Sequence, residues 1–335
     1  MDRNASNDTI GSEAAVDQDT GPEWSYVQTT EMIIATIGIV SNFVVILAVL
    51  GTSSLRAKLT YKLTVCLAVA DFISCVFLIP RSLRGFFPVP NGIGGEIYCR
   101  TSKATVLWVS LVASTYSLLA ITGERFFAIV YPIAYSARKD NVPAWLIVGA
   151  VWLLAFIMQS FNVYNNSYDA AQQNCKYQWP FGEGYQTFAG IGLFFSTYFI
   201  PLVFLSAAYY KMLKVLRQNQ RRVGSETTSS QPGATKLRAR KRVVKMFLVV
   251  FLAFAIFWAP NQFLFLIQNF GFRLSSNSAT YNFTRIFAGC NSCVNPFIYA
   301  VWSRPFRDGI RSIFCRNHSG GDGSDTQTTS NVGQA

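Results

Sequence analysis

The chain has little charge for its length. Only 14% of its 335 residues are Asp, Glu, Lys or Arg, whereas soluble domains usually carry about 25%. Hydrophobic residues make up 51% of the chain and aromatic residues 15%. The few charges are clustered in short connectors, and long uncharged runs lie between them. This composition argues against a soluble domain and predicts a protein that crosses a membrane several times.

Histidine and catalytic motifs are also scarce. The one histidine is His318, near the C-terminal end. No nucleophile or phosphate-loop motif is found, so the sequence does not indicate an enzyme. Seven cysteines do not suggest a disulfide framework in a chain of this size. Cys290 and Cys293 form a C-x-x-C, but inside an apolar segment we interpret them as small packing residues.

Seven apolar segments follow a polar, acidic tail. They cover residues 32–51, 60–83, 102–130, 143–162, 187–212, 243–268 and 280–302, each near the roughly 20 residues that cross a bilayer. We predict an all-α membrane protein with a seven-helix bundle over residues 31–302. Residues 1–30 and 317–335 are expected to be disordered tails, and residues 303–316 an amphipathic helix in the membrane interface.

The position of positive charge predicts the orientation. With the N-terminus outside, about 21 of the 29 Lys and Arg fall on the cytoplasmic side. We therefore expect a multi-pass protein of the plasma membrane with an extracellular N-terminus. The net charge of +12 would attract anionic lipids or a cytosolic partner, and we do not expect binding to nucleic acid. Asn4 and Asn7 begin glycosylation motifs, and Cys315 is a candidate for palmitoylation.

Polar side chains inside the apolar segments are the main sign of function, because burying them costs free energy. Asp71 lies in the middle of the second segment, and Glu124 and Arg125 lie at the inner end of the third. Further polar groups at comparable depth are Asn42, Ser114, Asn291, Ser292 and Asn295. A carboxylate among hydroxyl and amide oxygens can hold a small hard cation. The alternative is a hydrogen-bond network that only ties the helices together.

Several motifs follow one another in a characteristic order. They are Ser41-Asn42, Leu67-Ala68-Val69-Ala70-Asp71, Glu124-Arg125-Phe126, Trp152, Pro201 with Tyr209, Phe254-Ala255-Ile256-Phe257-Trp258-Ala259-Pro260 and Asn295-Pro296-Phe297-Ile298-Tyr299. From Gly38 to Phe314 their order and spacing resemble the rhodopsin-like (class A) G-protein-coupled receptors, most of all the neuropeptide-receptor branch. Each motif alone is weak, but their joint order is very hard to reach by chance.

The resemblance implies roles for these residues. A sodium ion would act as an allosteric modulator, with Asp71 and Ser114 as metal ligands. Its pocket would comprise Asp71, Ser114, Trp258, Asn291, Ser292 and Asn295. An activation switch would comprise Glu124, Arg125, Tyr209, Phe254, Trp258, Pro260, Pro296 and Tyr299. Through it, outward movement of the sixth helix would activate a heterotrimeric G protein, with receptor kinases and arrestin as further partners.

The resemblance also implies a disulfide between Cys99 and Cys175. The sequence departs from the family pattern at several positions, among them Phe126, Phe257 and Thr115. Cys99 lies 26 residues before Arg125, one more than is usual in the family, which implies a local bulge or a shifted helix start. Arg240 stands where some members carry an acid that clamps Arg125. Without this clamp the inactive state would be weaker, so we expect measurable basal activity.

Two kinds of residue that are absent from particular stretches of the sequence restrict the class of ligand. No lysine lies between Tyr281 and Trp302, which argues against retinal, and no acid lies between Thr105 and Trp108, which argues against biogenic amines. The outer ends of the segments are instead basic. The predicted ligand-binding residues are Arg81, Arg84, Lys103, Leu107, Trp108, Asn261, Gln262, Phe265, Tyr281 and Arg285. Converging cations suggest an anionic group on the ligand, and the whole set resembles that of peptide receptors.

Other interpretations remain open from the sequence. The cations could extend to lipid headgroups, and Glu31 or Glu96 could neutralise one or two of them. The same fold could serve a small anionic or lipid ligand. A sodium- or proton-coupled transporter could use Asp71 as its ion carrier, although no internal repeat of the kind that transporters show is visible.

Overall fold

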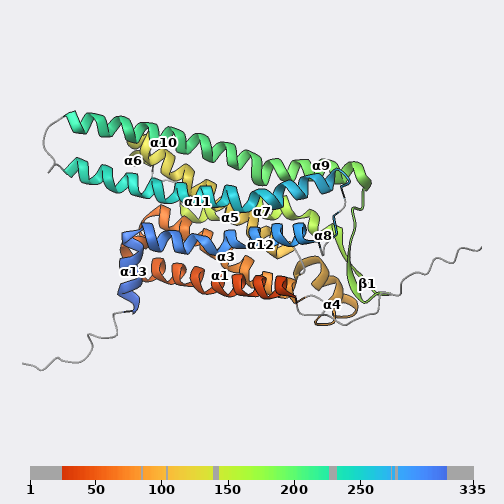
Figure 1. Cartoon of the computed structure of the whole chain (residues 1–335). Helices are drawn as coiled ribbons and strands as arrows, with labels where there is room; N and C mark the ends of the chain where they lie inside the picture. The colour runs from red at the N-terminus through yellow and green to blue at the C-terminus, as the bar shows by residue number, and fades with distance from the viewer. Residues whose placement is uncertain are drawn as a thin grey trace, which may run out of the picture.

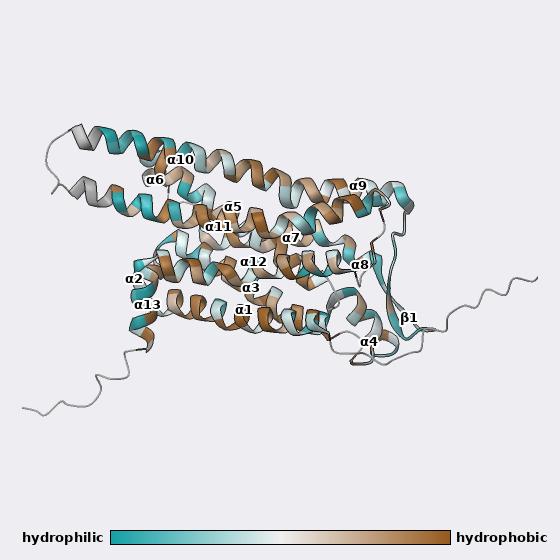
Figure 2. Ribbon diagram, viewed as in Figure 1, coloured by the Kyte–Doolittle hydropathy of each residue, from teal (hydrophilic) through white to brown (hydrophobic). Residues whose placement is uncertain are grey.

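The computed structural model describes residues 25–83, 86–102, 105–138, 143–225, 232–272, 274–275 and 278–314. Their long helices run side by side as a bundle (Figure 1). A β-hairpin and the short helix α4 lie at one end, which we call the hairpin end, and α13 lies at the other, the α13 end. Hydrophobic residues fill the middle of the bundle and hydrophilic residues gather toward both ends (Figure 2).

The described residues contain the seven long helical units that the sequence predicts. They are α1 (Tyr26–Gly51), α3 (Leu59–Ser82), α5 (Thr105–Val130), α7 (Ala144–Gln159), α9 (Gly182–Phe194) continued by η2 (Phe195–Phe199) and α10 (Ile200–Ser225), α11 (Pro232–Asn269), and α12 (Ala279–Trp302). By length and composition, six of these units are apolar enough to cross a membrane. The seventh, α12, is more polar because it carries Asn291, Ser292 and Asn295, which are buried inside the bundle.

Shorter elements connect these units. They are α2 (Ser53–Arg56), α4 (Gly92–Ile97), η1 (Tyr98–Ser102), α6 (Pro132–Arg138), α8 (Phe161–Asn165), β1 (Asn166–Asp169), β2 (Asn174–Tyr177) and α13 (Arg304–Phe314). The two strands pair antiparallel, with Tyr168 opposite Cys175. α13 lies across the end of the bundle (Figure 1). It starts after Ser303, whose hydroxyl accepts a hydrogen bond from the Phe306 backbone N–H at 3.3 Å, and Phe306 packs on Tyr299.

α1 begins at Tyr26, so the helix includes residues 26–30, which the sequence assigns to the tail. A capping box explains the earlier start. The Ser25 hydroxyl accepts a hydrogen bond from the Gln28 backbone N–H at 3.4 Å, and the Gln28 side chain accepts one from the Ser25 N–H at 2.6 Å. These two bonds satisfy backbone donors that would otherwise have no partner at a helix start.

The bulge implied by the additional residue before Arg125 lies at η1. This segment is a π-helical turn that contains Cys99, and a π-helical turn holds more residues than an α-helical turn. Cys99 is disulfide-bonded to Cys175 of β2. The disulfide that the resemblance implies is therefore present, and it fixes the hairpin to the start of the third long helical unit.

Five predicted residues lie outside the described part of the chain. They are Asn4, Asn7, Arg84, Lys103 and Cys315. The predictions of glycosylation, palmitoylation and part of the ligand site that rest on them stay predictions. The same holds for both predicted tails beyond residues 25–314.

Candidate functional site

A cavity of about 410 Å³ opens at the hairpin end. Six predicted ligand-binding residues line it, namely Arg81, Trp108, Asn261, Gln262, Phe265 and Tyr281. The rest of its described wall comes from the ends of α7 and α11, from α8, from the hairpin and from α9 and η2. We call this space the large cavity. Two further predicted residues, Leu107 and Arg285, lie in a neighbouring cavity described below.

Side-chain amides dominate the polar wall of the large cavity. They are Gln159, Asn162, Asn166, Gln186, Asn261, Gln262, Gln268 and Asn269. Each amide group contains both a donor and an acceptor, as a peptide group does. Some are used within the protein, because Asn162 donates to Gln159, Asn166 to the Asn162 carbonyl and Asn269 to the Phe265 carbonyl. Arg81 is the one charged residue among the described residues that line the cavity. Most of these amides lie near helix ends or in connectors without a family motif, so motif reasoning from the sequence does not find them.

An aromatic wall stands beside the amides. Phe161 and Trp179 stack with ring centroids 5.7 Å apart and planes 5° from parallel. Tyr177 and Tyr185 pack their edges against Trp179. Such offset or edge-on ring pairs add stability beyond the area that they bury. The packed rings give the cavity an apolar stretch of wall beside its hydrogen-bonding one.

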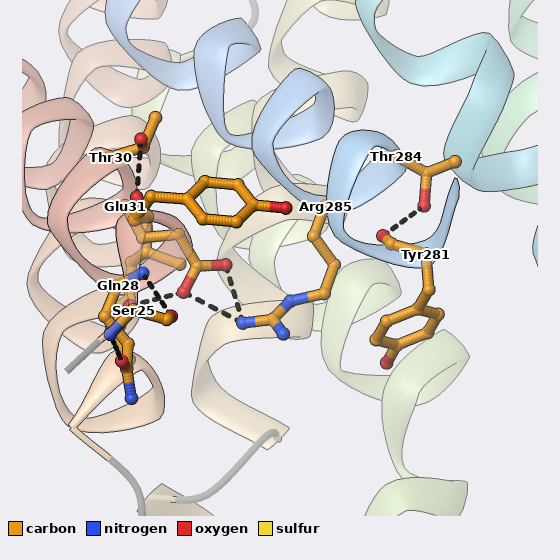
Figure 3. Close-up of polar contacts among 10 residues, drawn as sticks. Ser25, Gln28, Thr30, Glu31, Tyr281, Thr284 and Arg285 are labelled. Atoms are coloured by element: carbon orange, nitrogen blue, oxygen red, sulfur yellow. Dashed lines mark hydrogen bonds and ion pairs between the residues drawn. The ribbon is translucent and has the colours of Figure 1, made fainter. Parts of the chain in front are cut away.

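A small deep cavity of about 30 Å³ adjoins the large one, and Arg81, Trp108 and Asn261 line both. Arg285 of α12 reaches across it to Glu31 of α1 (Figure 3). Its Nη2 donates to Glu31 Oε1 at 2.6 Å and to Oε2 at 2.8 Å. The Ser82 hydroxyl of α3 donates to Glu31 Oε2 at 2.6 Å. Three helices thus meet at one buried carboxylate, and Glu31 does neutralise one of the predicted cations.

A second polar cluster surrounds Asp71 in the middle of the bundle. Asn295 donates from its side-chain amide to Asp71 Oδ2 at 2.8 Å. Ser74 donates to the Asp71 carbonyl and lies 3.0 Å from the Ser292 hydroxyl. Asp71 Oδ1 is buried and has no hydrogen-bond partner within the described residues. Ser74 belongs to no family motif and is not among the predicted site residues, although its place three residues after Asp71 puts both on one helix face.

A third cluster lies near the α13 end. Glu124 and Arg125 form an ion pair within α5. Glu124 also accepts hydrogen bonds from Thr60 of α3, at 2.9 Å, and from Tyr135 of α6. Partial burial, together with the bond to the Glu124 carboxylate, raises the pKa of Tyr135 to about 12. A tyrosine hydroxyl is protonated at neutral pH in any case, and the raised pKa means that Tyr135 stays a donor to Glu124 in more alkaline solution as well.

The other predicted switch residues lie between these clusters. Tyr209 makes a hydrogen bond of 3.1 Å with Thr122 and stacks on Phe251. The buried Tyr299 hydroxyl has no partner in the described structure. Pro260 and Pro296 stand inside α11 and α12, where proline weakens the helical hydrogen-bond ladder. A cavity of about 580 Å³ opens at the α13 end between Arg125, Arg240 and the start of α3.

The Trp258 ring connects the large cavity with the interior. Its centroid lies 6.5 Å from that of Trp108, which lines the large cavity. The buried Trp258 Nε1 has no hydrogen-bond partner among the described residues. Phe254, one turn away in α11, is also buried and contacts the ring of Tyr198. Packing is therefore continuous from the cavity wall to the α11 helix that carries Pro260.

Comparison with known proteins agrees with this arrangement. A family model described as 7 transmembrane receptor (rhodopsin family) matches residues 41–299, well over half of the chain. The chain belongs to this family. It is therefore a class A receptor and a multi-pass membrane protein, and not an enzyme.

Several receptors are similar to this class A receptor over most of their length. The allatostatin-A receptor of Bombyx mori is 28% identical over 297 residues, which cover 84% of this chain and 77% of that protein. The galanin receptor type 2 of Rattus norvegicus is 27% identical, covering 87% and 76%. The [Phe13]-bombesin receptor of Bombina orientalis is 24% identical, covering 91% and 81%.

The predicted residues of this class A receptor gather at three places, namely the two adjoining cavities, the surroundings of Asp71, and the Glu124–Arg125 pair near the α13 end. Eight of the ten predicted ligand residues lie on the two adjoining cavities, and the remaining two lie outside the described residues. Asp71, Asn291, Ser292 and Asn295 are buried in the middle of the bundle. Arg100, a further basic residue at this end, pairs with Glu96 and donates to the Val163 carbonyl. Its charge is thus engaged at the hairpin end.

Proposed function

We propose that this receptor binds an extracellular peptide in the large cavity and activates a heterotrimeric G protein at the α13 end. The observation that carries the proposal is a cavity lined by eight side-chain amides together with aromatic rings, with Trp108 in contact with Trp258. Amides match the donors and acceptors of a peptide backbone. The three relatives, which are receptors for allatostatin-A, galanin and bombesin-type peptides by name, support the same class of ligand.

The proposed signal starts where the peptide meets Trp108. Pressure on this ring would displace Trp258, and α11 would bend at Pro260. The half of α11 nearest α13 would then move outward. Arg125 would leave Glu124 and approach Tyr209 and Tyr299, whose buried hydroxyl has no partner in the described structure. Binding a G protein at the widened cavity would stabilise this second arrangement.

The residues around Asp71 suit a sodium ion. Asp71 Oδ1 is a buried carboxylate oxygen without a partner in the described structure. Ser114, Asn291, Ser292 and Asn295 are buried nearby candidates that offer neutral oxygens, the ligand type that hard cations prefer. A bound sodium ion would supply positive charge to the carboxylate. The chain's own part is to hold Asp71 by Asn295 and so to favour the arrangement present before activation.

The proposed orientation follows from the site. The hairpin end, with its disulfide, would face the extracellular space, where disulfides persist. The α13 end would face the cytoplasm and the anionic lipids of the plasma membrane. We also propose receptor kinases and arrestin as cytoplasmic partners, on the basis of the Ser/Thr clusters in the sequence at 225–230 and 326–330.

A peptide screen tests the proposal. Cells that express the receptor would be exposed to a panel of short peptides, with calcium and cAMP as readouts. We expect at least one peptide to evoke a response that Arg125→Ala removes while surface expression is retained. Gln262→Ala should raise the effective concentration of that peptide about tenfold, because it removes a hydrogen-bonding amide from the wall. A response that is unaffected by Arg125→Ala would contradict the proposed coupling.

A further inference from the structure

The ion pair between Glu31 and Arg285 at the small deep cavity is largely shielded from solvent. Glu31 is only 2% exposed, and the side chain of Arg285 is 19% exposed. Both carboxylate oxygens of Glu31 accept a hydrogen bond from Arg285, and one of them also accepts from Ser82. The carboxylate is therefore fully engaged, and the charge of Arg285 is balanced where it lies.

The local structure fixes both partners of this pair. Glu31 lies in the second turn of α1, directly after the capping box formed by Ser25 and Gln28 (Figure 3). Arg285 lies in the second turn of α12, which begins at Ala279 after the N-cap residue Ser278, and the Ser278 hydroxyl accepts a hydrogen bond from the Tyr281 N–H at 3.2 Å. The guanidinium carbon of Arg285 lies 5.7 Å from the centre of the Tyr281 ring. The N-terminal caps of α1 and α12 thus fix the two helix starts from which Glu31 and Arg285 meet.

A second carboxylate at this point would be unfavourable. It would approach Glu31, and two negative charges that share a buried site repel each other. The arginine also has little to gain, because its charge is already paired with a carboxylate. The geometry therefore disfavours an anionic ligand group at Arg285, which the basic residues in the sequence predict.

An uncharged hydrogen-bond acceptor suits the donor of Arg285 that the ion pair leaves unused. The Arg285 Nε is buried and has no hydrogen-bond partner within the described residues. A buried donor without an acceptor costs free energy, and a carbonyl oxygen would satisfy it without bringing charge. Asn261 lines the same cavity and could pair with the same neutral group. Arg81, the other cation of this cavity, is placed over the Trp108 ring at 5.6 Å.

We propose that Glu31 is a specificity-determining residue of this receptor. By neutralising Arg285 it makes the small deep cavity accept an uncharged carbonyl or carboxamide group of the ligand and reject a carboxylate. This inference rests on the proposed peptide-binding function, since it names the chemistry of the peptide group that reaches deepest. A peptide that inserts a terminal carboxamide or a backbone carbonyl would satisfy the cavity, and one that inserts a free carboxylate would not.

The test uses benzoate and benzamide, which have nearly the same shape and differ in charge. Thermal unfolding of the purified full-length receptor in detergent would be measured with each probe at equal ionic strength. In Glu31→Gln the charge of Arg285 is no longer balanced, so benzoate should raise the melting temperature about 2–4 °C more than benzamide does. The wild type and the double variant Glu31→Gln/Arg285→Gln should both lack this additional stabilisation. Any contribution of Arg81 is common to all three proteins and cancels.

Two results would overturn the inference. One is an equal preference for benzoate in the wild type and in Glu31→Gln, which would mean that Arg285 is not neutralised. The other is a benzoate effect in Glu31→Gln that persists in the double variant, which would place the anion elsewhere. If the single variant does not fold, the comparison of wild type and double variant decides, because a larger benzoate shift in the wild type contradicts the proposal. Failure of the peptide screen would leave this test readable, since neither probe is a peptide.

Discussion

At the hairpin end, Cys99 is bonded to Cys175 and Arg285 reaches from α12 to Glu31 of α1. At the α13 end, the corresponding cation Arg125 pairs with Glu124, its neighbour in the same helix. Among the described residues, no ion pair joins Arg125 to α11. The hairpin end is therefore cross-linked between helices, and the α13 end is held by weaker contacts between them.

The contacts of α11 show the same contrast along a single helix. Near the hairpin, Thr187 of α9 donates to the Asn269 carbonyl at 2.9 Å, and Gly190 packs so closely that an added Cβ would lie 2.4 Å from Cβ of Asn269. Toward α13, α11 packs rings on its neighbours, such as Phe251 on Tyr209, and it makes side-chain hydrogen bonds from Tyr198 to the Ala255 carbonyl and from Lys241 to Gln220. A helix that packs closely at one end and is held mainly by side-chain contacts at the other can pivot at Pro260 between them.

Breaking the covalent link should have the largest effect. Cys99→Ser removes the bond between η1 and the hairpin, and loss of a native disulfide commonly costs about 2–5 kcal/mol. We expect most of the receptor to be lost from the cell surface, as measured by antibody staining of a tagged N-terminus. Cys290→Ser, which alters a half-buried free thiol, is the control and should retain surface expression. Equal expression of both variants would show that the disulfide does not hold the hairpin end together.

Breaking the buried ion pair should come next. Glu31→Ala leaves Arg285 with a largely buried, unbalanced charge and should cost about 3 kcal/mol of stability, the low end for a broken buried pair because the Arg285 side chain is still 19% exposed. The matched control is Glu96→Ala, because Glu96 and Arg100 form a pair at the same end that is partly exposed, at 42% and 37% of their side chains. That control should cost about 0–1 kcal/mol. Thermal unfolding of the two purified variants measures the difference, and similar losses would contradict the burial argument.

Removing the proposed sodium ligand should have a smaller effect that depends on salt. Sodium at ten times its dissociation constant should stabilise the wild type by about 1.4 kcal/mol, measured as a rise in melting temperature when sodium replaces a large organic cation. In Asp71→Asn this rise should vanish, because the neutral amide no longer attracts the ion. A sodium effect that survives the substitution would indicate that the polar cluster only ties the helices together.

Weakening the ion pair at the α13 end should change the free energy least, but it should change basal G-protein activity measurably. Glu124→Gln removes the charge that retains Arg125, and a shift of about 1 kcal/mol toward the active arrangement would raise basal G-protein activity about fivefold. Nucleotide exchange on a purified G protein measures it. Arg125→Ala is the control and should show no basal exchange. If Glu124→Gln lowers basal exchange below the wild type, the ion pair does not restrain Arg125.

The seven apolar segments predict the seven helices, and the resemblance carried by the order of motifs implies the disulfide. The start of α1 was less accurate, since the capping box of Ser25 and Gln28 is local chemistry that hydropathy does not reveal. The extra residue before Arg125 correctly indicated the bulge at η1. Here a deviation in spacing was more informative than composition.

The candidate ligand site was only partly predictable. Trp108, Asn261 and Phe265 follow from their place beside family motifs, and all three line the large cavity. The amides of α8 and α9 did not follow, because the hairpin and its disulfide bring them to the cavity from connectors whose path the sequence does not define. The pairing of Glu31 with Arg285 spans 254 positions, so only the packing of α1 against α12 shows it.

Spin-label distances at the two ends test the central contrast most directly. One pair of labels would replace exposed Ile133 and Arg238 near the α13 end, and another would replace exposed Tyr164 and Phe270 at the hairpin end. Cys290 and Cys293 would be changed to alanine in both proteins. On adding nucleotide-free G protein, the α13-end distance should gain a population longer by about 5–10 Å, while the hairpin-end distance should stay within about 2 Å. Equal changes at both ends, or no change at the α13 end in a complex that forms, would contradict the account.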